Sequence, residues 1–284
     1  MPSPPEKRKK TKSPERSMTL IEHLRELRSR IFKALIFIVI GAAIGFWWYS
    51  HGLLQFLQNP YCDLPASMRL TDGTGGCKLL FFNPTDGLVL RLKISFMTGM
   101  VISAPFWLYE LWAFVTPGLH KNERRWAVSF VGVSSFLFAL GTACAYLTLK
   151  AGLRVLVGLA GPDVTAALSA PEYLNFVIIL LIVFGVSFEL PLLMVMLNLV
   201  GVLKYDLLKK SRRWLIFLTF VFAAVITPSQ DPFSMLAMAI PMAILFECAI
   251  QFARVHDKRV ARRQMAQGFE DIPDDEPSPL NPEE

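Results

Sequence analysis

The chain has 284 residues, of which 53% are hydrophobic and only 18% are charged, with 29 Lys and Arg against 23 Asp and Glu. Average soluble domains carry about 25% charged residues and disordered chains are poor in apolar ones, so this composition excludes a disordered protein. Four cysteines in a chain of this length exclude a small disulfide-stabilised scaffold. The net charge of +6 would suit a nucleic-acid-binding protein or a membrane protein, and the positions of the basic residues decide between them.

The N-terminal part combines a basic tail with an amphipathic segment. Residues 1–17 are rich in Lys, Arg and Pro, and we expect a disordered tail near anionic headgroups. Thr19 and Glu22 then fit a helix capping box. Glu26 and Arg30 lie four residues apart, so we expect them to pair on the polar face of the helix that follows. The other face is apolar, with residues at helical spacing: Leu20, Leu24, Leu27 and Ile31.

The remaining apolar residues gather in blocks that predict membrane-spanning helices. Four blocks, at 34–49, 94–113, 126–149 and 173–200, approach or exceed the roughly 20 residues that cross a bilayer core of about 30 Å. They lack the polar face that a helix in a soluble protein would need. Two further blocks follow at 214–227 and 233–253, separated by a proline-rich turn. This pair is either a re-entrant hairpin or two short helices in a locally thinned bilayer, and the predicted total is six helices.

The basic residues orient these helices. With the N-terminus inside, 23 of the 29 Lys and Arg fall in inner segments and six in outer segments. The positive-inside rule therefore predicts that both termini are cytoplasmic, which requires an even number of helices. Topology and anionic lipid account for the positive charge, so we expect no nucleic-acid partner. Five tryptophans near predicted helix ends are typical of aromatic belts: Trp47, Trp48, Trp112, Trp126 and Trp214.

The first outer loop contains two cysteines, Cys62 and Cys77. Because an outer loop faces an oxidising compartment, we expect these two to form a disulfide, worth about 3 kcal/mol in the chain-entropy model. The cysteine spacing suits no zinc site, and we expect neither a metal nor another cofactor.

Catalytic motifs are missing from the sequence, which has no P-loop, no H-E-x-x-H and no G-x-S-x-G. We therefore expect no enzyme, and an intramembrane protease is disfavoured for the same reason. Glu189 is the one fully charged group in the fourth block, where an acid costs about 2.5–3.5 kcal/mol. Such an acid usually faces a cavity or a partner, although a hydrogen-bonded structural glutamate is the alternative. An ion-coupled secondary transporter of a small solute remains an alternative function.

Several short runs, in this order and helical context, resemble the TatC family, the polytopic subunit of the twin-arginine protein translocase. The resemblance extends over about residues 18–255 and leaves out the two tails and the outer loop that contains Cys62 and Cys77. The runs are HLRELR at 23–28, SAP at 103–105, LWAF at 111–114, KNERR at 121–125, FGVSFELP at 184–191 and TP at 227–228.

This resemblance implies an all-α polytopic membrane protein with six transmembrane helices, the fifth and sixth unusually short, bent into a concave receptor. It divides the chain into a basic tail (1–17), a membrane domain (18–255) and an acidic, proline-rich cytoplasmic tail (256–284). It also implies residence in a bacterial inner membrane and binding of twin-arginine signal peptides on folded cargo. The implied partners are TatA- and TatB-like single-span proteins in an oligomeric complex driven by the proton-motive force.

The resemblance also assigns roles to individual residues. Glu26 and Glu123 match the family's signal-recognition carboxylates, Glu189 matches its intramembrane acid, and Asp231 matches an acid in the outer turn. Three further residues match neighbouring functional positions: Arg28, Phe114 and Lys121.

Overall fold

The computed structural model describes residues 20–66, 77, 79–115, 123–159, 169–227 and 231–270. These residues are helical apart from short connections, which include an isolated bridge between Leu80 and Ser169. The basic tail expected at 1–17 lies outside the described residues, as does the part of the tail expected at 256–284 that follows residue 270. In chain order the elements are α1 (Leu20–Trp48), the π-helical turn η1 (Tyr49–Leu53), α2 (Leu54–Cys62), α3 (Asp86–Ile102), α4 (Ala104–Val115), α5 (Glu123–Leu159), α6 (Ala170–Ser187), α7 (Leu190–Leu199), α8 (Tyr205–Ile226) and α9 (Pro232–Glu270).

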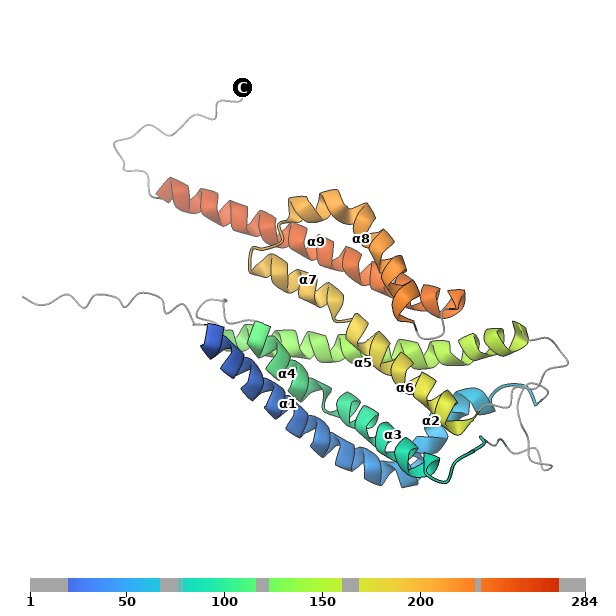
Figure 1. Cartoon of the computed structure of the whole chain (residues 1–284). Coiled ribbons are helices and arrows are strands. Elements are labelled where there is room, and N and C mark those ends of the chain that lie inside the picture. The colour runs from blue at the N-terminus through green and yellow to red at the C-terminus, as the bar shows by residue number, and fades with distance from the viewer. Residues whose placement is uncertain are drawn as a thin grey trace, which may run out of the picture.

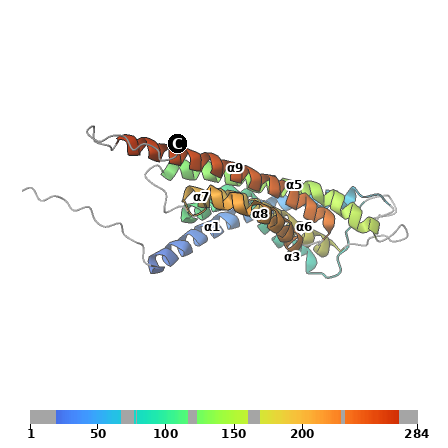
Figure 2. The ribbon, with the colours of Figure 1, turned by 90° about the horizontal axis from the view of Figure 1, so that it is seen from above.

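The helices form one packed assembly around α5 (Figure 1). On one side α4 connects α5 to α1, and on the other side α6 and α9 pack against α5, with α8 against α9. Figure 1 shows the start of α1 and the end of α9 at the same side of the molecule, on the left, and α2 at the opposite side. An even number of crossings would place these two helix ends on one side. Figure 2 shows, from above, that the end of α9 also projects beyond the other helices.

One expected span is bent sharply. Helices α3 and α4 meet at an angle of 62° around Ser103. Pro105 lies in the first turn of α4, and because proline has no backbone N–H it cannot continue the hydrogen-bond ladder of α3. The indole N–H of Trp107 donates to the carbonyl of Met100 across the bend, at 2.9 Å. The bend therefore leaves this carbonyl satisfied, as a polar group within a membrane requires.

A second interruption lies between α6 and α7, at Phe188 and Glu189. Pro191 occupies the first turn of α7, so the carbonyl of Ser187 loses its usual helical donor. This weak point in the helix backbone is the one expected from the sequence, and it places Glu189 at a break rather than within a regular turn.

Close contacts between helix backbones hold two helix pairs together. A Cβ atom on Gly99 of α3 would lie 2.4 Å from the backbone nitrogen of Ala42 on α1, and one on Gly41 would lie 2.6 Å from the carbonyl oxygen of Gly99. A Cβ on Gly141 of α5 would similarly meet the carbonyl oxygen of Phe184 at 2.6 Å. Small residues at such crossings allow the dense packing that associates helices in lipid.

The number of crossings agrees in part with the sequence prediction. Within the described residues, 4 helical stretches are long and apolar enough to cross a membrane, or 5 if the bent pair α3–α4 forms one span. Helix α8 is not among them, since its first half carries four basic residues and its apolar part, 214–227, is short. The sixth crossing therefore stays a prediction.

Two expectations from the sequence are wrong. The last helix is not short, because α9 runs for 39 residues and continues well beyond residue 255. Polar residues such as Arg254 and Lys258 end an apolar block, but they are good helix formers and do not end a helix. Trp112 does not belong to an aromatic belt, since it is 2% exposed, whereas Trp47 and Trp214 are largely exposed as expected.

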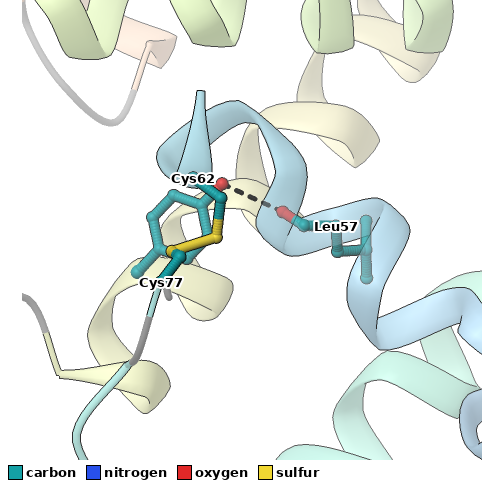
Figure 3. The surroundings of a disulfide bond; sticks show 4 residues. Leu57, Cys62 and Cys77 are labelled. Carbon is teal, nitrogen blue, oxygen red and sulfur yellow. Dashed lines mark hydrogen bonds between the residues drawn. A yellow bond between two sulfur atoms is a disulfide. The ribbon is translucent and has the colours of Figure 1, made fainter. Parts of the chain in front are cut away.

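Helix α2 is held in place by a disulfide bond and by a hydrogen bond from a buried tyrosine. Cys62, the last residue of α2, forms a disulfide with Cys77, and their Cα atoms are 5.5 Å apart (Figure 3). The hydroxyl of Tyr173 on α6 donates to the carbonyl of Leu57 on α2, at 2.9 Å. The short helix α2 is thereby attached both to its own following loop and to the core.

The opposite end is fastened by Asp257 of α9. Its carboxylate accepts a hydrogen bond from the backbone N–H of Tyr205 at 2.7 Å and one from the Asn198 amide at 3.1 Å. Since Tyr205 begins α8, an acid from α9 caps the N-terminus of α8, where a negative charge is favourable. The part of α9 beyond residue 255 is thus joined to the bundle.

Candidate functional site

Three charged side chains from α1 and α4 form a cluster, hereafter the Glu26–Arg30–Glu110 cluster. The guanidinium of Arg30 donates to Glu26 Oε1 from Nε at 3.0 Å and from Nη2 at 2.6 Å. Its Nη1 also reaches Glu110 Oε2 at 3.4 Å. The pairing of Glu26 with Arg30, expected from their spacing on one helix, is confirmed.

Exposure differs within this cluster. The side chains of Arg30 and Glu26 are 24% and 25% exposed, whereas that of Glu110 is only 10% exposed. Two carboxylates face one guanidinium, so the three side chains together carry a net charge of −1. The cluster is therefore a negatively charged site next to the exposed arginines of α1, which include Arg25 and Arg28.

Two of the other residues expected to bind the signal, Phe114 and Glu123, lie at the ends of helices α4 and α5. Phe114, in the last turn of α4, is half-buried, and Glu123 is the first residue of α5. Because α4 contacts both α1 and α5, the structure brings these helix ends to the same side of the molecule (Figure 1). Lys121 and the side chain of Glu123 lie outside the described residues.

Glu189 belongs to a separate, buried hydrogen-bond chain. The hydroxyl of Ser134 on α5 donates to Glu189 Oε2 at 2.6 Å and accepts from the indole N–H of Trp112 on α4 at 2.8 Å. Ser134 is 0% exposed and Glu189 is 9% exposed, so the acid faces the interior of the protein. Its second oxygen, Oε1, is buried and makes no hydrogen bond within the described residues. Glu189 is thus held by one oxygen and has capacity for one further donor.

Helix α4 contributes to both the Glu26–Arg30–Glu110 cluster and the buried hydrogen-bond chain. Glu110 and Trp112 are two residues apart on α4, and the first reaches α1 whereas the second reaches α5. A displacement of α4 against either neighbour would disturb both groups at once. Neither Ser134 nor this connection could be recognised from the sequence, because a serine among apolar residues has no distinguishing pattern.

An apolar groove lies next to the α6–α7 break. Its volume is about 380 Å³ and its walls come from α5, α7 and α9, including Val133, Pro191, Leu192 and Leu245. Pro191 follows Glu189 by two residues, so the buried acid and this groove share the same interruption of the helix. The groove is thus an apolar surface beside the helix break that contains Glu189.

The other expected residues have structural surroundings away from the surface cluster. Asp231 is 5% exposed, and its Oδ1 accepts from the backbone N–H of Ser234, so it caps the start of α9. The disulfide of Cys62 and Cys77 lies at the end that contains α2. Within the described residues, no group of three His, Cys, Asp or Glu is placed to hold a metal ion.

Comparison with known proteins agrees with this architecture. Residues 22–241 match the family model described as Sec-independent protein translocase protein (TatC). The chain is 49% identical to the TatC protein of Frankia casuarinae, covering 93% of this chain and 73% of that one. It is 45% identical to the TatC protein of Corynebacterium kroppenstedtii, covering 96% of this chain and 70% of the relative.

The fold also resembles a solved structure, the crystal structure of the twin-arginine translocase receptor TatC in DDM. The TM-score is 0.68 at 32% identity, over 82% of this chain and 99% of that one. The family model, the relatives and the solved structure agree with the motifs and with the helical membrane architecture. The chain belongs to the TatC family, a component of the Sec-independent, twin-arginine protein translocase.

Proposed function

We propose that this chain is the receptor subunit that binds twin-arginine signal peptides, with Glu26 and Glu123 as the carboxylates that accept the two arginines. One observation carries the proposal: Glu26, at the surface of α1, already holds a guanidinium, that of Arg30, through two N–H donors. A site that binds an arginine of its own chain has the chemistry to bind an arginine of a signal peptide.

Arginine is favoured over lysine at such a site for a geometric reason. A guanidinium presents several N–H donors in one plane to a carboxylate, whereas an ammonium acts as a point charge. Pairs this exposed are worth only about 0–1 kcal/mol each, so charge alone cannot supply the affinity. We propose that Phe114 contacts the apolar stretch of the signal, and that Arg28 and Lys121 help to shape the same surface. The concave receptor surface expected from the family is part of this proposal.

The proposal includes a location and partners. We place the chain in a bacterial inner membrane with six crossings and both termini in the cytoplasm, which puts the Glu26–Arg30–Glu110 cluster on the cytoplasmic side. Assembly with TatA- and TatB-like single-span proteins and coupling to the proton-motive force belong to the same proposal. Two observations support a contact of Glu189 with a polar residue of a partner helix: its Oε1 makes no hydrogen bond within the described residues, and an apolar groove lies beside the same helix break. Asp231, the cap of α9, then stabilises the turn between the last two helices.

Peptide crosslinking and export test the binding roles. In a strain that depends on this chain, a folded reporter is expected to be exported with an Arg-Arg signal and not with a Lys-Lys signal. Glu26→Ala and Glu123→Ala should each lower crosslinking of the Arg-Arg signal to the chain. Glu172→Ala, which removes an exposed acid at the opposite end of the molecule, is the matched control and should leave the yield unchanged. Wild-type yields from both Glu26→Ala and Glu123→Ala would refute their assignment.

The role of Glu189 is tested by two substitutions. Glu189→Gln retains a polar group of the same shape, whereas Glu189→Leu removes the side-chain hydrogen bond to Ser134. If the acid contacts a partner, Glu189→Leu should abolish export and also lower the recovery of a TatB-like partner with the purified chain. Normal export by Glu189→Leu would show that the acid serves only the packing of this chain.

A further inference from the structure

We propose that Arg30 is a built-in competitor for the signal peptide: its guanidinium occupies Glu26 until a signal arginine displaces it onto Glu110. This inference rests on the proposed function, because it concerns how the same carboxylate is reached. It assigns roles to two residues, Arg30 and Glu110, that the resemblance and the comparisons leave without one.

The contacts show that the resting site is occupied. Glu26 Oε1 accepts from both Nε and Nη2 of Arg30, at 3.0 and 2.6 Å. Because both residues lie on α1, four positions apart, their pairing costs little ordering of the backbone. An incoming arginine therefore meets a carboxylate that already has a partner, and binding requires an exchange of partners.

Glu110 supplies the position to which Arg30 can move. Its Oε2 lies 3.4 Å from Nη1 of Arg30, so the guanidinium already spans the two carboxylates. The Glu110 side chain is only 10% exposed, and an ion pair is less screened where water is excluded. When a signal arginine takes Glu26, Arg30 can retain a carboxylate partner without crossing a gap. The exchange ends with two guanidinium groups on two carboxylates, whereas the resting cluster holds an excess of one negative charge.

An internal competitor has a recognisable effect on binding. It lowers the affinity of every ligand that must displace it by the same factor, because the cost of freeing Glu26 does not depend on the ligand. Specificity for arginine over lysine then comes from Glu26 itself. Arg30 sets only the free-energy cost that every ligand must offset to bind. A residue that touched the signal directly would instead change the ratio of the two affinities.

The test measures binding of fluorescent Arg-Arg and Lys-Lys signal peptides to the full chain in lipid nanodiscs. Arg30→Lys keeps the charge but loses the planar fork, and Arg30→Gln removes both. We expect the affinity for both peptides to rise by about two-fold in Arg30→Lys and about five-fold in Arg30→Gln, with an unchanged ratio between the peptides. Arg25→Gln removes an exposed arginine from the same helix and measures the effect of net charge alone, which must be smaller.

A second pair of variants tests whether the displaced Arg30 pairs with Glu110. Glu110→Gln should weaken binding of both peptides in the wild-type background, because a displaced Arg30 then lacks a carboxylate partner. In the Arg30→Gln background the same substitution should have little effect, so the two changes are not additive.

The outcomes separate this inference from the proposed function. If Glu26→Gln weakens Arg-Arg binding but both Arg30 variants leave it unchanged or weaken it, Glu26 is the receptor group and the competitor is refuted. A changed ratio between the two peptides in Arg30→Lys would also refute it, since Arg30 would then contact the signal. If Glu26→Gln has no effect on binding, the proposed function fails at this residue and the inference fails with it.

Discussion

Ser134 is the middle member of the buried hydrogen-bond chain that runs from Trp112 to Glu189. Removal of its hydroxyl is therefore the most informative test of the buried site. Ser134→Ala deletes the hydroxyl that donates to Glu189 and accepts from Trp112, and it leaves both partners buried without this bond. Hydrogen bonds between membrane helices are worth about 0.6 kcal/mol on average and up to about 1.7 kcal/mol. Loss of two such bonds therefore predicts a decrease of about 1–3 kcal/mol in the free energy of unfolding.

The adjacent residue provides the control. The hydroxyl of Ser135 is buried on the same helix and makes no hydrogen bond within the described residues, so Ser135→Ala should leave the stability unchanged or raise it slightly. The assay is reversible unfolding of the purified chain in mixed detergent micelles, followed by circular dichroism. Trp112→Phe should cost less in the Ser134→Ala background than in the wild type, because the indole has already lost its hydrogen bond to Ser134. Equal stabilities of Ser134→Ala and Ser135→Ala would refute the hydrogen-bond chain.

Two further predictions concern covalent and close-packed contacts. Cys62→Ser should lower the free energy of unfolding by about 3 kcal/mol, the loop-closure contribution of a disulfide across 15 residues, and reduction of the wild type should reproduce this loss. Cys248→Ser, at an exposed free cysteine, should change nothing, and equal effects of the two substitutions would contradict the prediction. Gly99→Ala should cost about 1–3 kcal/mol, because its Cβ would lie 2.4 Å from the backbone of α1 and force the helices apart. Gly87→Ala, on the same helix with nothing within 4 Å of its Cβ, should be neutral or stabilising in the same unfolding assay.

The sequence predicts the apolar helices well because hydropathy and helical period act over long stretches. All six apolar blocks are largely helical, although the α3–α4 bend interrupts the second and the α6–α7 break interrupts the fourth, and the spacing of Glu26 and Arg30 correctly predicts their pairing. The weak point after Glu189 is also predicted, since a proline two residues later removes a backbone donor.

Contacts between distant segments are what the sequence could not predict. Glu189 meets Ser134 across 55 positions, and this contact depends on the rotation of α5 against α6, which small residues such as Gly141 and Gly185 permit. The reach of Arg30 to Glu110 across 80 positions likewise depends on the bend between α3 and α4. Residues whose role depends on such geometry carry no local pattern, so reading motifs alone leaves them out.

The length of α9 has a mechanical consequence. A helix of 39 residues is about 58 Å long, whereas a bilayer core is only about 30 Å thick. If the apolar part at 233–253 crosses the core, the polar remainder forms a rod of about 25 Å that extends away from the lipid. Asp257 braces this rod against α8 at its base, so it leaves the membrane at a defined angle. The end of α9 at Glu270 is thereby carried clear of the headgroups on a stiff helical arm.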